Sequence, residues 1–278
     1  MDWQIHLRTV PYIQSESIMN NPIKELKKHF VVDLLNIKNI FVCLLLGSIG
    51  LAHSQQRVDV IPEEQLSYTI YKANPWSGRP ASTVMVGHGC SGIIHIQTQD
   101  FVQNLTSWGH NVVVVDSWGP RGIKSVCKMT QPYYSAEDRV SEFYAIANRI
   151  KHESWHNGRL GYIGFSHGGS LGLALAGRGR VFDAIVSYYP HCGTNAFRTR
   201  QMQIPTQMHV SYGDTWTPAQ WCESITGNVE KVVYKDATHA WDIRAPDRIY
   251  MGELLRYHAQ ADRESKDATR RFFEDNLK

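Results

Sequence analysis

The pentapeptide G-F-S-H-G at residues 164–168 places a serine between two glycines, at the spacing of a nucleophilic turn. Residues 159–165 form a short apolar run typical of a buried strand, and residues 169–176 form a small aliphatic run typical of a helix. A G-x-S-x-G sequence between a strand and a helix indicates a nucleophile elbow, which exposes the serine hydroxyl at a helix N-terminus. Ser166 is therefore the candidate nucleophile, beside backbone N–H groups that suit an oxyanion.

An aspartate and a histidine follow two later predicted strands. The order Ser166, Asp214, His239 is the order of nucleophile, acid and base in α/β-hydrolases. A serine needs a base to remove its proton, and that base needs a carboxylate to fix its tautomer, so we predict a catalytic triad. Asp236 and Asp242 are alternative acids, but both lie too near His239 in the sequence to reach round its ring easily.

Other residues near the predicted strand ends could bind the substrate. The segment H-G-C-S-G at residues 88–92 follows the first strand, so we expect the backbone N–H groups of Cys90 and His167 to form the oxyanion hole. Three tryptophans lie just past the predicted strand ends and could line an apolar pocket: Trp118, Trp216 and Trp241.

One motif points to different chemistry. His152 and His156 enclose an H-E-x-x-H sequence, which binds zinc when both histidines lie on one helix. The motif straddles the predicted end of a helix and no third ligand is evident, so we favour two polar histidines and no metal.

Short apolar runs alternate with helical stretches after about residue 60. Strands are predicted at residues 82–87, 111–116, 159–165, 183–189, 207–212 and 229–235, and helices at 98–110, 135–153 and 259–276. Ser135 is the predicted N-cap of the second helix. This alternation predicts an α/β-hydrolase fold, with a mostly parallel central sheet and helices on both faces. Ligands bind such sheets at the carboxyl ends of the strands, where the candidate residues lie.

The composition is that of an ordinary soluble enzyme. The 278 residues are 42% hydrophobic and 20% charged, with a net charge of +3. Because no long Lys or Arg run is present, we expect no nucleic-acid partner.

The N-terminal region differs from the rest. An apolar run at residues 40–52 follows several lysines, and Ala52 and Ser54 occupy the −3 and −1 positions of a cut before Gln55. This pattern predicts a secretory signal peptide. The apolar run is too short for a comfortable membrane span, although an uncleaved anchor and an element of the folded domain are alternatives.

Cleavage would remove residues 1–54 and leave residues 55–278, a length that suits one domain. Because the basic region is long, Met19 is an alternative start. We expect a periplasmic or secreted protein with no stable membrane insertion after cleavage, or an N-terminally anchored one if the segment is kept.

Cleavage would also remove Cys43 and leave four cysteines, an even number that favours disulfides in an exported protein. Four cysteines allow three pairings, of which we favour Cys90–Cys127 with Cys192–Cys222.

Residues from about 60 to 278 resemble the dienelactone hydrolase family of α/β-hydrolases. The resembling segments are V-M-V-G-H-G-C-S-G (84–92), V-V-V-V-D-S-W-G-P-R-G (112–122), G-Y-I-G-F-S-H-G-G-S (161–170), S-Y-G-D-T-W-T-P (211–218) and T-H-A-W-D (238–242). The family's namesake enzymes are cytoplasmic and use a cysteine nucleophile, whereas this chain has Ser166 and a predicted export signal. In the family an arginine in the region of Arg121 contacts a substrate carboxylate, so the resemblance suggests this role for Arg121.

Together these patterns predict a serine hydrolase that cleaves a small-molecule ester or lactone through an acyl-enzyme and needs no cofactor. A peptidase or amidase with the same triad is one alternative. A non-catalytic binding module on a hydrolase scaffold is another, although the complete set of three triad residues argues against it.

Overall fold

A seven-stranded sheet is the centre of the fold. The computed structural model describes residues 60–74, 78–128, 133–179, 181–193 and 201–278, so the predicted signal peptide lies outside the described residues. The strands are β1 (Ser67–Tyr71), β2 (Ala81–Gly87), β3 (Asn111–Asp116), β4 (His156–Phe165), β5 (Ala184–Tyr188), β6 (Gln201–Ser211) and β7 (Thr226–Tyr234). Their order is β1-β3-β2-β4-β5-β6-β7, and only β1 runs antiparallel to its neighbour.

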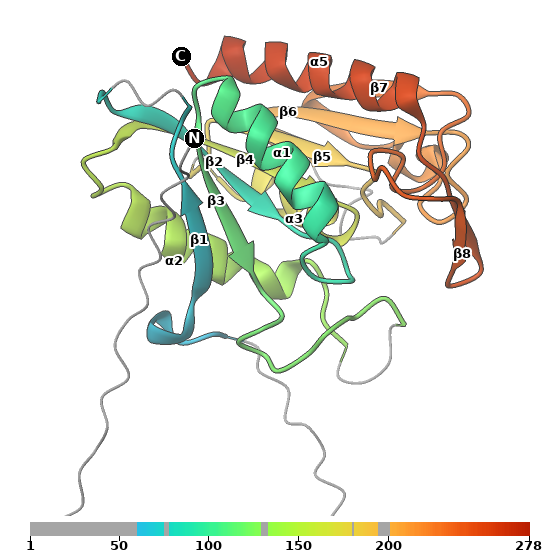
Figure 1. The fold of residues 1–278 in the computed structure, drawn as a ribbon, viewed down its shortest axis with the longest axis horizontal. Coiled ribbons are helices and arrows are strands. Elements are labelled where there is room, and N and C mark those ends of the chain that lie inside the picture. The colour runs from blue at the N-terminus through green and yellow to red at the C-terminus, as the bar shows by residue number, and fades with distance from the viewer. Residues whose placement is uncertain (1–59, 75–77, 129–132, 180, 194–200) are drawn as a thin grey trace, which may run out of the picture. The chain divides into compact units, whose positions relative to one another are not determined.

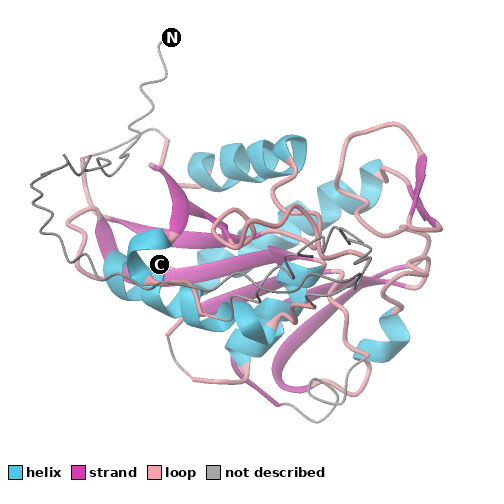
Figure 2. Cartoon of the chain, turned by 90° about the horizontal axis from the view of Figure 1, so that it is seen from below, coloured by secondary structure: helices cyan, strands magenta, loops and turns pink. Residues whose placement is uncertain are grey.

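Helices cover both faces of this sheet (Figures 1 and 2). They are α1 (His95–Ser107), α2 (Val140–Ile150), α3 (His167–Ala176) and α5 (Ala259–Asn276). Buried residues of α2 and α3 share one core cluster, and buried residues of α1 and α5 share the other. The predicted fold class, a mostly parallel sheet between two helical layers, is confirmed.

Strand β3 illustrates how the sequence builds the two layers. Val113 and Val115 belong to the core under α2 and α3, whereas Val112 and Val114 belong to the core under α1 and α5. Because side chains alternate across a strand, an unbroken valine run fits only a strand that is covered on both sides. Full burial of each valine contributes about 1.5–3 kcal/mol relative to exposure.

Helix α2 begins later and ends earlier than the helix predicted at residues 135–153. A 3₁₀ turn, η2 (Glu137–Arg139), precedes the helix, which ends at Ile150. Ser135 does not cap it, because the Ser135 backbone N–H and hydroxyl both donate to the Asp138 carboxylate, at 2.7 and 2.8 Å. This local hydrogen bonding forms a turn in place of a first helical turn.

Close backbone contacts join β4, α3 and the end of β2. A Cβ atom on Gly168 would lie 2.0 Å from the Gly87 carbonyl oxygen, and one on Gly164 would lie 2.2 Å from the Gly168 carbonyl oxygen. The Tyr162 hydroxyl donates to that same Gly168 oxygen at 2.6 Å. The turn between β4 and α3 is therefore packed against β2 too tightly for any residue but glycine at these positions.

A two-stranded hairpin follows the sheet along the chain. It consists of β8 (Arg248–Tyr250) and β9 (Glu253–Leu255), paired antiparallel. Figure 1 shows β8 beyond one end of the sheet. None of the helices in the described part of the chain combines the length and the hydrophobicity that a membrane crossing requires.

Candidate active site

Ser166 occupies a strained turn between β4 and α3. Its backbone has φ 54° and ψ −113°, and helix α3 begins at the next residue, His167. The Ser166 N–H donates to the Tyr188 carbonyl oxygen at the end of β5, at 2.9 Å. A left-handed φ is costly for a residue with a side chain and occurs where surrounding contacts enforce it. Here the neighbouring strands and glycines hold the Ser166 hydroxyl at the carboxyl edge of the sheet.

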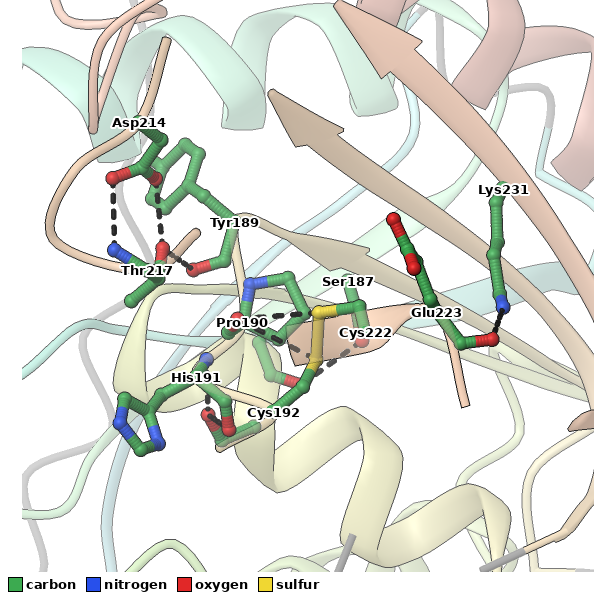
Figure 3. The surroundings of a disulfide bond; sticks show 12 residues. Ser187, Tyr189, Pro190, His191, Cys192, Asp214, Thr217, Cys222, Glu223 and Lys231 are labelled. Carbon is green, nitrogen blue, oxygen red and sulfur yellow. Dashed lines mark hydrogen bonds between the residues drawn. A yellow bond between two sulfur atoms is a disulfide. The ribbon is translucent and has the colours of Figure 1, made fainter. Parts of the chain in front are cut away.

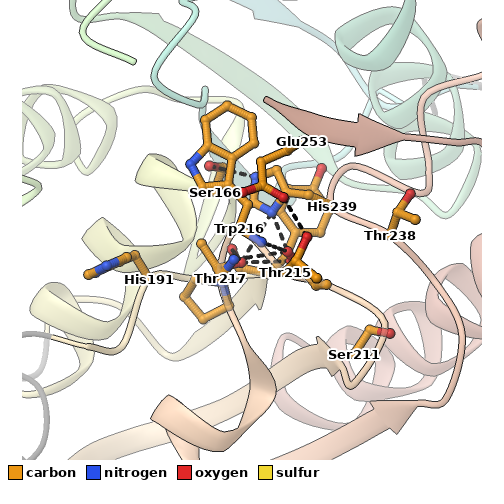
Figure 4. Close-up of polar contacts among 12 residues, drawn as sticks. Ser166, His191, Ser211, Thr215, Trp216, Thr217, Thr238, His239 and Glu253 are labelled. Atoms are coloured by element: carbon orange, nitrogen blue, oxygen red, sulfur yellow. Dashed lines mark hydrogen bonds and ion pairs between the residues drawn. The ribbon is translucent and has the colours of Figure 1, made fainter. Parts of the chain in front are cut away.

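A continuous hydrogen-bonded chain links Ser166 to the His239 imidazole (Figure 4) and from there to the Asp214 carboxylate. His239 Nε2 lies 3.0 Å from Ser166 Oγ, and His239 Nδ1 lies 2.8 Å from Asp214 Oδ2. Asp214 follows β6 and His239 follows β7, whereas Ser166 follows β4. Three segments that are distant in the sequence thus bring together the geometry of a serine, its base and an orienting acid.

The Asp214 carboxylate is buried and well supplied with donors. Its Oδ1 accepts from the backbone N–H groups of Trp216 and Thr217, both at 2.9 Å. Its Oδ2 accepts from the Thr217 hydroxyl at 2.7 Å as well as from His239. Burial acts to raise the pKa of Asp214, but His239 and the hydrogen bonds from Thr217 outweigh it and lower the pKa below its ordinary value. Asp214 is therefore held as a carboxylate.

Thr217 contacts both Asp214 and His239, and it was not singled out from the sequence. Its hydroxyl oxygen lies 3.1 Å from His239 Nδ1 and 3.1 Å from the Tyr189 carbonyl oxygen, in addition to its contact with Asp214. Thr217 thus fixes the acid, the imidazole and the segment after β5 relative to one another.

Cys90 and His167, the expected oxyanion residues, lie on the two segments that flank the Ser166 hydroxyl. Gly89 and Cys90 line the same pocket as Ser166, and His167 directly follows Ser166. The Cys90 loop is tied down by the Trp118 indole N–H, which donates to the Cys90 carbonyl oxygen at 3.1 Å, and by a disulfide to Cys127. The loop is thereby preorganised for a backbone donor role.

The buried side chain of Arg139 connects these two segments. Arg139 Nη1 donates to the His88 carbonyl oxygen at 2.9 Å and lies 3.1 Å from His167 Nδ1. Because guanidinium only donates, His167 Nδ1 must accept, and its Nε2–H then donates to the Tyr134 carbonyl oxygen at 3.0 Å. Burial and the Arg139 charge lower the pKa of His167 to about 3, so this imidazole stays neutral.

Both disulfides lie beside the site, and they join the pairs that we favoured from the sequence. The Cys192–Cys222 bond links the segment after β5 to the short helix η3 (Ala219–Cys222). Figure 3 shows this bond beside Pro190, with Tyr189 and Thr217 nearby. It therefore connects the two chain segments that meet at the Thr217 hydroxyl.

An apolar pocket of about 200 Å³ opens at Ser166 and His239. Its apolar side chains come from the loop after β2, from β4, from the segment after His239 and from the hairpin. They are Ile94, Phe165, Ala240, Ile243 and Leu255. Polar or aromatic side chains complete the lining: Ser91, Gln97, Tyr189, Trp216, Arg248 and Tyr250. Such a pocket fits a small, largely apolar ligand with a few fixed polar contacts.

Arg121 does not reach this pocket, contrary to the expectation from the resemblance. It is 4% exposed, and its Nη1 donates to the Ser117 carbonyl oxygen at 2.7 Å and to Glu142 Oε1 at 3.0 Å. The buried Glu142 carboxylate draws the guanidinium inward, so Arg121 ties down its own loop. Among the described residues, the Arg or Lys side chain that lines the pocket is Arg248, in the hairpin.

The three tryptophans have different positions. Trp216 lines the pocket, with its ring centroid 4.8 Å from that of His239, as expected. Trp118 and Trp241 are not among the lining residues, and both are buried, at 2% and 0% exposed. Trp118 packs under the Cys90 loop, and Trp241 packs in the core beside Tyr234, because the apolar cores bury more of each ring than the pocket would.

The H-E-x-x-H motif forms no metal site in the structure. His156 is the first residue of β4 and bonds Thr83 through Nδ1 at 2.9 Å, whereas His152 lies beyond the end of α2. Among the described residues, no group of His, Cys, Asp and Glu side chains is arranged to hold a metal ion. Of the alternative acids, Asp236 is exposed and Asp242 bonds Gln97 and Tyr189.

Comparisons with known proteins agree with this arrangement. The family model described as "Dienelactone hydrolase family" matches residues 69–277. A putative dienelactone hydrolase from Klebsiella pneumoniae has a similar structure, with TM-score 0.62 and 14% identity over 75% of this chain and 92% of that chain. A dienelactone hydrolase-like promiscuous phosphotriesterase from metagenomic libraries gives TM-score 0.61 and 16% identity over 77% and 93%.

A third similar structure is a serine hydrolase without a lid from Xanthomonas campestris. It gives TM-score 0.55 and 16% identity, over 76% of this chain and 88% of that chain. No curated protein matches the chain. At these identities the similar structures support the fold, while the family assignment rests on the family model.

Proposed function

Because the chain belongs to the dienelactone hydrolase family, we propose that it is a serine hydrolase that cleaves carboxylic esters or lactones through an acyl-enzyme. The observation that carries the proposal is the hydrogen-bonded chain from Asp214 through His239 to Ser166, which opens into an apolar pocket. Hydrolysis is the activity class of the family, and the pocket volume suits a small acyl group.

In the acylation step, Ser166 Oγ attacks the ester carbonyl carbon while His239 Nε2 takes the serine proton. Asp214 holds the imidazole in the required tautomer and stabilises its charged form. The negative carbonyl oxygen of the tetrahedral intermediate accepts hydrogen bonds from the backbone N–H groups of Cys90 and His167. The intermediate then expels the alcohol, which receives the proton from His239, and the acyl group remains on Ser166.

In the deacylation step, His239 removes a proton from water, and the hydroxide oxygen attacks the acyl carbon. The second tetrahedral intermediate uses the same two backbone donors. Its collapse releases the carboxylic acid, and His239 returns the proton to Ser166. No cofactor takes part in either step of this scheme.

The test is hydrolysis of p-nitrophenyl acetate by the full chain and by its Ser166→Ala variant. We expect the variant to lose at least about 10³-fold in kcat, because only the backbone donors and binding would remain. Ser107→Ala, at the exposed end of α1, is the matched control and should keep wild-type activity. A fluorophosphonate probe should label Ser166 in the wild type.

Equal rates for wild type and Ser166→Ala would contradict the proposal. Turnover of a matched anilide at a rate similar to the ester would favour the peptidase or amidase alternative. Absence of both turnover and labelling would favour a binding module.

We further propose that residues 1–54 are a signal peptide and that residues 55–278 are exported as one α/β-hydrolase domain. Two disulfides support this, because such bonds persist in oxidising compartments. N-terminal sequencing of the exported protein should begin at Gln55. Ala52→Arg, which removes the small residue at −3, should block cleavage, and an exported wild-type protein with an intact N-terminus would contradict the proposal.

A further inference from the structure

A buried triangle of polar side chains lies in the wall of the pocket, apart from the triad. Gln97 comes from α1, Tyr189 from the residue after β5, and Asp242 from the segment after His239. Gln97 Nε2 lies 2.6 Å from Asp242 Oδ2 and 2.7 Å from the Tyr189 hydroxyl oxygen. The Tyr189 hydroxyl lies 2.7 Å from Asp242 Oδ1. All three residues are buried.

The number of protons fixes the orientation of the Gln97 amide. Three short contacts require three protons, one in each contact. With the amide nitrogen facing the triangle, Gln97 supplies two protons and the Tyr189 hydroxyl supplies one, to Asp242 Oδ1. With the amide reversed, Gln97 supplies none, and Tyr189 and a protonated Asp242 together supply only two. The amide nitrogen therefore faces Asp242 and Tyr189.

This orientation leaves the Gln97 carbonyl oxygen for the pocket. Gln97 lines the pocket together with Ser166, and its Oε1 is neither hydrogen-bonded within the described residues nor one of their buried unsatisfied atoms. The walls beside it are apolar, from residues such as Ile94 and Ile243. The oxygen thus presents an acceptor in a surrounding where a hydrogen bond to a ligand has little competition from other side chains.

The triangle is also built to keep this oxygen in place. Tyr189 has φ 37°, a left-handed conformation that surrounding contacts must enforce, and its ring lies 4.7 Å from the His239 ring. Because the Gln97 amide donates to the Asp242 carboxylate, electron density moves toward Oε1 and strengthens it as an acceptor. An orientation fixed in advance reduces the entropy that binding costs.

We propose that Gln97 Oε1 is a substrate-specificity contact, which makes the enzyme prefer esters that carry a hydroxyl or N–H donor in the part held by the pocket. The proposal rests on the proposed esterase function and deepens it by naming a substrate class. Gln97 has no hydrogen bond to the triad residues Ser166 or His239, so its effect is on selection between substrates.

The experiment compares matched esters with the full chain. The probes are p-nitrophenyl phenylacetate, its 2-, 3- and 4-hydroxy derivatives, and the pair p-nitrophenyl 3-hydroxybutyrate and butyrate. We expect at least one hydroxylated ester to exceed its deoxy partner about tenfold in kcat/KM, the value of one well-placed hydrogen bond. The Gln97→Met variant, of similar size but without the acceptor, should bring that ratio close to one. Gln103→Met, at an exposed position of the same helix, should leave the ratio unchanged.

A wild-type enzyme that turns over every ester without preferring any hydroxylated member would overturn this inference and leave the proposed function standing. That measurement needs no variant, so it decides the matter even if Gln97→Met does not fold. A wild-type preference that Gln97→Met retains would also overturn it. Failure to turn over any of the esters in a Ser166-dependent manner would overturn the proposed function, and this inference with it.

Discussion

At the scale of single residues, Thr217 is the contact that ties the acid to the rest of the site. Its hydroxyl bonds the Asp214 carboxylate and lies within hydrogen-bond distance of His239 Nδ1. Loss of this hydroxyl removes one of the donors to a buried carboxylate, whereas loss of the carboxylate removes the partner of the imidazole. Substitution of Asp214 should therefore lower kcat more than substitution of Thr217.

We expect Asp214→Asn to lower kcat for p-nitrophenyl acetate about 10³–10⁴-fold, because the imidazole loses its correct tautomer. Thr217→Val should lower it roughly tenfold, the value of a hydrogen bond to a charged group, and Thr217→Ser should restore it. Thr226→Val, at an exposed position at the start of β7, is the control. A Thr217→Val enzyme with wild-type kcat would mean that the backbone donors alone hold Asp214.

Single residues also show which parts of the site can be predicted from the sequence and which cannot. Ser166, Asp214 and His239 could be chosen from the sequence because each follows a predicted strand and their order is that of a triad, and in the structure they are hydrogen-bonded in that order. The expectation that Arg121, Trp118 and Trp241 contact the substrate is wrong, since the sequence locates a loop without giving the direction of its side chains. Arg121 turns inward to Glu142, a partner 21 positions away that no motif indicates.

At the scale of elements, the β8–β9 hairpin supplies the pocket's outer wall. Arg248, Tyr250 and Leu255 from this hairpin line the pocket, and Glu253 bonds Thr215 beside Trp216. The short strands alternate weakly and are partly exposed, which is why no strand was predicted there. Strand β1, also short and at the sheet edge, was missed for the same reason, whereas the valine run of β3 and the closing helix were found with their bounds.

The hairpin's charge gives a prediction about anionic substrates. Arg248→Gln should raise KM for a p-nitrophenyl ester with a free carboxylate, such as the hemisuccinate, about tenfold, and change KM for the acetate little. Arg244→Gln, which loses an ion pair with the buried Asp262 but does not line the pocket, is the control. Equal increases for both esters would show that Arg248 acts on the pocket's shape and not on substrate charge.

The Cys90–Cys127 disulfide constrains the loop after β2, which we propose supplies an oxyanion donor. Its removal by Cys90→Ser with Cys127→Ser should lower the free energy of unfolding by roughly 4 kcal/mol on chain-entropy grounds, for a separation of 37 residues. It should also lower kcat, because the backbone N–H of residue 90 becomes mobile. Cys43→Ser, in the predicted signal peptide, should change neither quantity. Urea denaturation measures the free energy of unfolding, and ester hydrolysis measures kcat. An unchanged kcat would mean that catalysis does not depend on this disulfide.

At the scale of the whole molecule, buried neutral histidines make stability depend on pH. Burial lowers the pKa of His209 to about 3 and that of His110 to about 4, against an ordinary value of 6.5. Between pH 6.5 and 4 the unfolded chain therefore binds protons that the folded protein does not. The stabilisation is complete above pH 6.5 and is lost as pH falls toward the folded-state values.

We expect the free energy of unfolding to fall from pH 6.5 to 4, with each of these histidines contributing up to about 1.4 kcal/mol per pH unit. His209→Gln, which keeps polar atoms near Tyr234 and Thr269, should reduce this slope by about one proton. His152→Gln, exposed, should leave the slope unchanged. Urea denaturation at several pH values provides the measurement, and equal slopes for all three proteins would contradict it.

The close contact of Gly87, Gly164 and Gly168 limits which positions of this protein can accept a side chain. Any side chain at Gly164 or Gly168 would clash with backbone atoms, so a substitution there displaces the turn that carries Ser166, whatever the substrate. The pocket residues Ile94 and Leu255 carry no such constraint, because their side chains border open space. A mutational library aimed at new substrates therefore belongs in the pocket wall, where side chains can change while the backbone of the elbow is kept.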